Sequence, residues 1–184
     1  HANYMHYSDP ANYLTFSNTQ WDEFLSALED APVYCSAGFS DTSDDWITNV
    51  TFNTLNNTTG QEGEGSYGDY TGLATTVTAG QTYTLSVSFE SGTYNQHVWA
   101  WFDWNNNMDF TDDGEAYDLG DGASATLTTE VTVPANAAPS IRMRVIEQYD
   151  SDPGPCASAT YGEVEDYTVH VETLAANAAF SADI

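Results

Sequence analysis

Short stretches in which apolar and polar residues strictly alternate constrain this chain most. The cleanest runs through Tyr83, Leu85, Val87 and Phe89, with Ser or Thr at every position between them. Successive side chains of a β-strand point to opposite faces, so this pattern predicts a strand with one buried face. Similar stretches occur at 46–54, 73–77, 98–102, 127–133, 141–145 and 164–171, whereas 56–68 is predicted to be a polar loop. Together they predict an all-β fold, an antiparallel, jelly-roll-like β-sandwich.

The two ends of the chain depart from this pattern, so we divide it into residues 1–33, 34–172 and 173–184. In the first part, Asn18 and Thr19 suit a helix N-cap, and apolar residues then repeat at helical spacing from Trp21 to Leu28. This predicts a short N-terminal helix. The last part is small, apolar and nearly uncharged. It is interpreted either as a linker or as a strand that pairs with another copy.

The charge balance excludes several classes of partner. The chain carries 28 acidic residues against 2 basic ones, a formal charge of −26. Nucleic acid is excluded as a partner, because phosphate binding requires Lys and Arg. No apolar run reaches membrane-spanning length, so no membrane insertion is expected. Such a charge suits a medium in which salt or divalent cations relieve repulsion.

The strand at 98–102 leads into an acidic loop with a regular spacing of oxygen donors. Candidate ligands are Asp103, Asn105, Asn107, Asp109, Asp112, Asp113 and Glu115. Oxygen donors at alternate positions are typical of calcium-binding loops, so calcium is the predicted cofactor. The pattern differs from an EF-hand, because Met108 replaces the glycine of the sixth position and Glu115 comes one residue late. The alternative is a polar hairpin loop, since turns favour Asn and Asp.

Cys35 and Cys156 are the only cysteines, and they flank the predicted sandwich. In an oxidising compartment a disulfide between them would close a loop of roughly 120 residues and restrict the unfolded chain. Two buried free thiols are the alternative.

The arginines and the acidic residues near residue 165 predict a structural pairing. Arg142 and Arg144 share one face of a predicted strand, and Glu163 and Glu165 share one face of another. In so acidic a chain we expect these residues to form ion pairs between neighbouring strands. Metal binding by the two glutamates ranks second, and acid–base catalysis ranks last.

Aromatic residues near the acidic loop suggest a second kind of site. Trp99 and Trp101 share a strand face with His97, and Trp104 and Tyr117 lie nearby in the sequence. One interpretation is a platform on which a sugar ring stacks. The alternative is a second buried layer of the sandwich.

Residues 34–172 resemble the GEVED domain family of secreted bacterial proteins. The marks of this resemblance are Tyr34-Cys35, Trp46-Ile47, the run 102–110 with Gly114-Glu115, Val133-Pro134, Arg142-Met-Arg-Val145, Pro155-Cys156 and Gly162-Glu-Val-Glu-Asp-Tyr167. The resemblance implies an accessory β-sandwich, often attached to secreted peptidases. Upstream, Asn3-Tyr-Met-His-Tyr7 resembles the Met-turn before the last helix of pappalysin-like metzincin metalloproteases, although HExxHxxGxxH is absent.

These observations predict a secreted, extracellular bacterial module that is not an enzyme. Its expected role is to bind calcium and a carbohydrate or surface polymer, as in adhesion at the cell surface. The first alternative is an extracellular filament or matrix subunit that self-associates through its C-terminal tail. The second is the C-terminal fragment of a secreted zinc metalloprotease.

Overall fold

The protein is described from a computed structural model that covers residues 17, 19–21, 33–41, 43–63 and 65–173. The chain divides into two compact units, residues 1–33 and 34–184. The Met-turn-like stretch and the C-terminal tail from residue 174 lie outside the described residues, so the functions inferred from them remain predictions.

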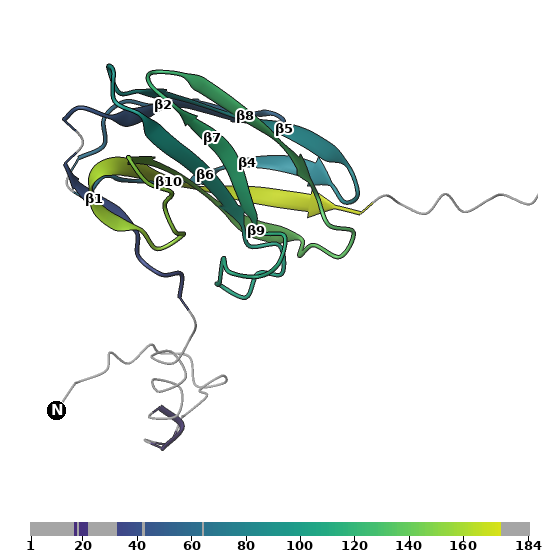
Figure 1. Ribbon diagram of the computed structural model, residues 1–184. Coiled ribbons are helices and arrows are strands. Elements are labelled where there is room, and N and C mark those ends of the chain that lie inside the picture. The colour runs from purple at the N-terminus through teal and green to yellow at the C-terminus, as the bar shows by residue number, and fades with distance from the viewer. Residues whose placement is uncertain (1–16, 18, 22–32, 42, 64, 174–184) are drawn as a thin grey trace, which may run out of the picture. The chain divides into compact units, whose positions relative to one another are not determined.

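The described residues form ten strands in two sheets that stack face to face (Figure 1). In spatial order the first sheet contains β1 (Gly38–Asp41), β10 (Ser158–Glu172), β9 (Ser140–Tyr149), β6 (Gln96–Phe102) and β7 (Ala116–Gly122), and β4 (Tyr67–Thr78) also pairs with β10. The second sheet contains β3 (Leu55–Thr58), β2 (Trp46–Phe52), β5 (Thr82–Glu90) and β8 (Thr126–Thr132). The predicted all-β sandwich is therefore confirmed.

The core between the sheets follows the predicted alternation. Leu85, Val87 and Phe89 of β5 are buried against Val98 and Ala100 of β6 and the rest of the inner cluster. Ser and Thr at the intervening positions of β5 hydrogen-bond to β8, as between Ser88 and Thr126. The apolar side of each strand thus supplies burial, and the polar side joins neighbouring strands.

The pairing at one edge of the first sheet differs from the antiparallel pattern. β10 is antiparallel to β9 but parallel to both β1 and β4. Parts of β3 and β4 fall in the stretch 56–68, which the sequence predicted as a loop, and β7 was not predicted. These strands alternate weakly, because β4 is exposed over much of its first half and β7 carries acidic and Gly residues.

The first sheet is unusual because its outer face is also buried in part. Phe39, Trp101, Phe110, Ile146 and Val164 form a second apolar cluster there. Gly38 pairs with Ser158, so β1 lies along the sheet edge beside this cluster. Both faces of β9 and β10 are consequently buried near their paired centre.

In the N-terminal unit, residues 19–21 are helical, as predicted, but Ser17 caps them and Thr19 does not, while Asn18 lies outside the described residues. Ser17 Oγ accepts a hydrogen bond from Gln20 N at 3.2 Å, and Gln20 Oε1 accepts one from Ser17 N at 2.9 Å. This reciprocal arrangement is a capping box. No helix among the described residues is long and apolar enough to cross a membrane.

The predicted disulfide between Cys35 and Cys156 is confirmed, with a Cα–Cα distance of 5.5 Å. Arg144 Nη1 donates to the carbonyl oxygens of Cys35 and Pro155, each at 2.8 Å. The bridge therefore joins the start of the sandwich to the loop before β10, and a buried arginine holds both sides.

Replacing both cysteines by serine is expected to lower the free energy of unfolding by roughly 2–5 kcal/mol, because the unfolded chain without the cross-link has more conformational entropy. Urea denaturation of the double variant measures this loss. Reduction of the parent protein should give the same loss, and an unchanged denaturation midpoint in both would contradict the prediction.

Candidate functional site

The acidic loop begins where β6 ends and closes through a series of side-chain to backbone hydrogen bonds. Asn105 Oδ1 accepts from Asn107 N at 3.0 Å, Asn107 Oδ1 from Asp109 N at 2.9 Å, and Asp109 Oδ1 from Thr111 N at 2.9 Å. The side-chain amides of Asn105 and Asn107 both donate to Asp112 Oδ2. Each Asn carbonyl oxygen has a second lone pair, so these turns do not preclude cation binding.

The loop makes its sharp turn at Met108, the position where a calcium-binding loop usually has glycine. Its φ is 67°, in the left-handed region where a glycine is usual. The carboxylate of Asp103 accepts hydrogen bonds from Met108 N at 2.9 Å and Asn107 N at 3.1 Å, and these bonds hold the turn. The sequence departs from the calcium-loop pattern here, but the backbone adopts the same kind of turn.

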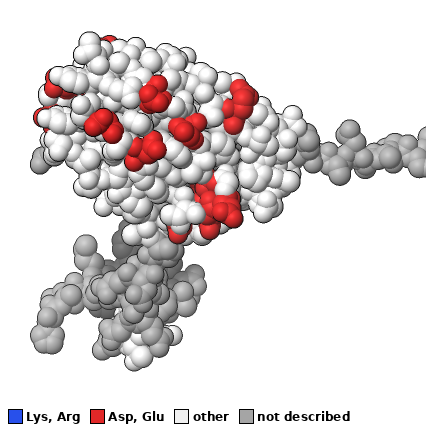
Figure 2. Space-filling view, in the orientation of Figure 1, with Lys and Arg blue, Asp and Glu red and all other residues white. Residues whose placement is uncertain are grey.

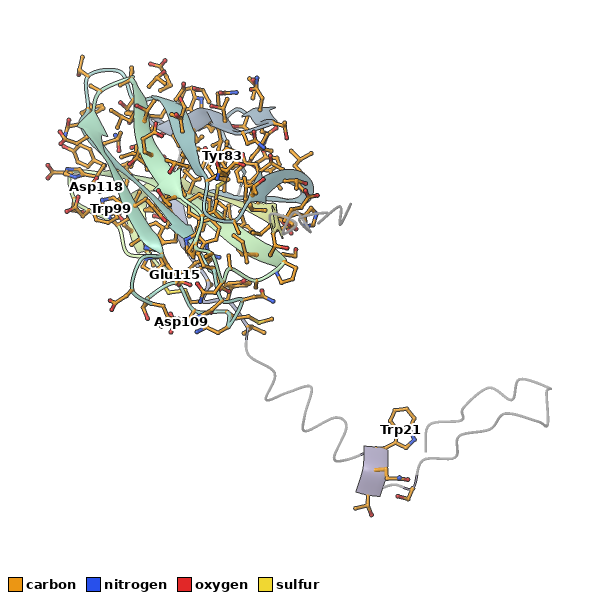
Figure 3. The ribbon with its side chains drawn as sticks, turned by 90° about the vertical axis from the view of Figure 1, so that its right-hand side faces the viewer. Trp21, Tyr83, Trp99, Asp109, Glu115 and Asp118 are labelled. Carbon is orange, nitrogen blue, oxygen red and sulfur yellow. A yellow bond between two sulfur atoms is a disulfide. The ribbon has the colours of Figure 1, made fainter. Side chains whose placement is uncertain are left out.

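Two buried carboxylates face the base of this loop. Asp103 is 0% exposed and Glu115 is 2% exposed. Glu115 Oε1 accepts from Trp104 N at 2.9 Å, whereas its Oε2 is buried without a hydrogen-bond partner among the described residues. Burial, followed by the charge of Asp103, raises the pKa of Glu115 to about 7. In Figure 3, Glu115 lies further inside the domain than Asp109 at the loop's outer edge.

The remaining predicted carboxylate ligands lie at the surface of the loop. Asp109, Asp112 and Asp113 are exposed. Within the described part of the chain, no three His, Cys, Asp or Glu side chains are already gathered as a metal-binding group. A cation in this loop would therefore also take oxygens from Asn105, Asn107 or the backbone, which is normal for calcium.

The predicted ion pairs are corrected by the structure, because both arginines bind Asp166. Arg144 donates from Nε and Nη2 to the two carboxylate oxygens of Asp166, each at 2.8 Å, and Arg142 Nη1 donates to Oδ2 at 2.9 Å. Arg144 lies directly opposite Asp166 in the β9–β10 register. Since alternate residues face opposite sides, the arginines share the outer face with Asp166, not with the two glutamates.

Glu163 and Glu165 instead point into the sandwich. Glu163 Oε2 accepts from Ile47 N and its Oε1 from Glu62 N, both at 2.7 Å, so it connects β10 to the opposite sheet. Glu165 Oε2 accepts from the hydroxyl of Tyr167 at 2.6 Å. Burial is the largest cause that raises the pKa of Glu163 to about 8 and that of Glu165 to about 7. Both carboxyl groups therefore lie between the sheets rather than beside the arginines.

The predicted aromatic platform is not formed. Trp101 is buried in the outer cluster, and Trp104 is buried in the inner core, where it stacks on Phe102 at 4.8 Å between ring centroids. Tyr117 is half-buried beside Trp104, on the face opposite to Trp99. Trp99 remains half-buried and lies beside Asp118 of β7 (Figure 3). The alternative interpretation, a second buried layer, is correct for Trp101.

Sequence reasoning missed an aromatic pocket at the other end of β6. Tyr94, Tyr149 and Tyr161 line a pocket of about 190 Å³ together with Asp44 and Asp45. The rings meet edge to face, Tyr149 at 5.7 Å from Tyr94 and at 6.1 Å from Tyr161. All three tyrosines are exposed by more than a third. No sequence pattern indicated this pocket, because its three tyrosines lie far apart along the chain.

Residues 97–170 match the GEVED domain. No curated protein matches the sequence.

Two solved structures are similar over part of the chain. A family 123 glycoside hydrolase from Clostridium perfringens is 11% identical over 59% of this chain and 23% of its own, with a TM-score of 0.34. An AA10 lytic polysaccharide monooxygenase from Streptomyces lividans is 13% identical over 53% of this chain and 59% of its own, with a TM-score of 0.29. The chain thus spans less than two thirds of either protein, and TM-scores below 0.5 do not identify a shared fold.

The buried glutamates predict how stability depends on pH in calcium-free buffer. The folded pKa values of about 8 for Glu163 and about 7 for Glu165 lie above the unfolded value of about 4.3. The unfolded chain therefore binds fewer protons between these limits, and stability falls as pH rises from 5 to 8. Urea midpoints measured with a chelator at constant ionic strength check this.

Asp and Glu residues with lowered pKa values titrate below pH 5, so they do not oppose the fall in stability between pH 5 and 8. The Glu163→Gln and Glu165→Gln double variant should show a shallower pH dependence, because those two groups no longer titrate. A parent protein that becomes more stable between pH 5 and 8 would contradict the assignment.

Proposed function

We propose, from the match of residues 97–170 to the GEVED domain, that this chain is a secreted, non-catalytic accessory module that binds calcium and carbohydrate. Accessory modules position a partner domain or a polymer, and they need stability and a binding surface rather than a catalytic group. The disulfide supports an oxidising, extracellular compartment.

The observation that supports calcium is the pair of buried carboxylates at the base of the acidic loop. Asp103 and Glu115 are both withdrawn from water, and Glu115 Oε2 has no partner in the described part of the chain. Like charges buried together are unfavourable unless a proton or a cation neutralises them. A hard divalent cation with oxygen ligands meets this requirement, and amide oxygens of the loop would complete its shell.

Carbohydrate binding is supported by the tyrosine pocket rather than by the tryptophans. Exposed aromatic rings offer apolar faces to a sugar ring, and the exposed carboxylate of Asp44 accepts hydrogen bonds from hydroxyl groups. The charged side chains on the face shown in Figure 2 are acidic wherever the structure describes them. With a net charge of −26, the partner is a neutral or amino-containing glycan and not an anionic polymer.

Calcium at a hundredfold excess over its dissociation constant is expected to stabilise the domain by about 2.7 kcal/mol, because it binds only the folded state. Thermal unfolding with calcium and with a chelator measures the shift. Asp103→Asn should abolish the shift from this loop, whereas the exposed control Asp121→Ala should retain it. Equal calcium responses in the parent and in Asp103→Asn would contradict the loop site.

Removing one ring of the tyrosine pocket is expected to weaken glycan binding about fivefold, because each stacked ring contributes about 1 kcal/mol. An array of neutral and amino-sugar oligosaccharides identifies a ligand, and titration compares Tyr149→Ala and Tyr161→Ala with the exposed control Leu73→Ala. Equal affinities in all three variants would place the binding surface elsewhere, and no bound glycan would refute this part of the function.

A further inference from the structure

The interior near the first residue of β6 holds several polar side chains whose atoms lack hydrogen bonds of regular geometry within the described part of the chain. Asp45 Oδ1, both side-chain polar atoms of Gln96 and both carboxylate oxygens of Glu147 have no hydrogen-bond partner among the described residues. Gln96 and Glu147 are 0% exposed, and Asp45 is 2% exposed. Native proteins contain few buried polar groups without partners, so a cluster of them requires an explanation.

The strand register places these side chains at one point. Glu147 lies opposite Val98 and Tyr149 lies opposite Gln96 in the β6–β9 pair, so Gln96 and Glu147 are diagonal neighbours on one face. That face is the inner one, because Val98 and Val145 on it belong to the core between the sheets. Asp45 precedes β2 of the opposite sheet, and Gln96 lies near its carboxyl.

The neighbouring side chains that the structure describes around this cluster are acidic. Glu163 lies directly opposite Glu147, and its own oxygens are occupied by Ile47 N and Glu62 N. Burial, followed by the charges of Asp45 and Glu163, raises the pKa of Glu147 to about 9. The two arginines lie on the other face of the sheet with Asp166. Within the described residues, neither arginine is therefore available to neutralise this cluster.

We propose that Asp45, Gln96 and Glu147 bind a second calcium ion between the two sheets. Two carboxylates and an amide carbonyl provide only oxygen donors, which suits a hard cation and not zinc or copper. Asp45 also lines the tyrosine pocket, so the pocket gives the ion a route from solvent. The ion would join Asp45 beside one sheet to Glu147 in the other.

This site is distinct from the acidic loop. Gln96 is the first residue of β6, whereas Asp103 follows its last residue, so the two sites lie at opposite ends of the same strand. Each can be removed without touching the other. The inference therefore does not depend on calcium binding by the loop.

The experiment counts calcium ions bound by the full chain, by native mass spectrometry and calorimetric titration. We expect two ions in the parent, one in Glu147→Gln, one in Asp103→Asn and none in the double variant. The exposed control Glu130→Gln should bind two. Glu147→Gln keeps the shape of the side chain and removes a buried charge, so with a chelator it should unfold at or above the parent's temperature.

Each other outcome decides the question. If the parent binds one ion that only Asp103→Asn removes, Glu147 is neutralised by a proton and the interior site is refuted while the loop site stands. If only Glu147→Gln removes that ion, the interior site stands and the loop site fails. A Glu147→Gln chain that still binds two ions would overturn the proposal.

Discussion

Asp166 is the group on which the outer half of this structure depends. It binds both arginines of the chain, and Arg144 in turn binds the backbone on each side of the disulfide. The Arg142 guanidinium lies 4.6 Å from the ring centre of Tyr34, whose hydroxyl donates to Asp103 at 2.6 Å. One buried ion-pair cluster thus connects the start of the sandwich, the bridge before β10 and the acidic loop. Removing one member of such a cluster leaves the others charged and unpaired.

The alternation of β10 explains the Gly162-Glu-Val-Glu-Asp-Tyr167 motif residue by residue. Val164 and Asp166 face outward into the second cluster and the arginines, and Glu163, Glu165 and Tyr167 face inward. Gly162 has a φ of 143°, and a Cβ there would lie 2.4 Å from the carbonyl oxygen of Glu147. Every position of the motif therefore has a structural task, and its acids hold sheets together rather than form an open site.

Sequence patterns predicted the architecture correctly where strand alternation alone determines which side chains are buried. They were insufficient where both faces of a strand are buried. The alternation at 83–89 and the cysteine positions predicted β5 and the disulfide correctly. The predicted partner of the arginines was wrong because Asp166 and the two glutamates that precede it point to opposite faces of the same strand. A shift of one residue in the strand register exchanges these faces, and the sequence pattern does not determine that shift. The tyrosine pocket was missed because Tyr94, Tyr149 and Tyr161 meet only after β6, β9 and β10 pair.

The shortage of basic residues makes the remaining buried acids a constraint on folding. The fold neutralises Asp166 with arginines and satisfies Glu163 with backbone N–H groups. Glu115 and Glu147 are neither paired with an arginine nor fully hydrogen-bonded, since each has at least one buried carboxylate oxygen without a partner in the described residues. A proton neutralises them at low pH, and in our proposals a divalent cation does so at neutral pH. Cation binding and folding are then linked, because only the folded chain brings the oxygen donors together.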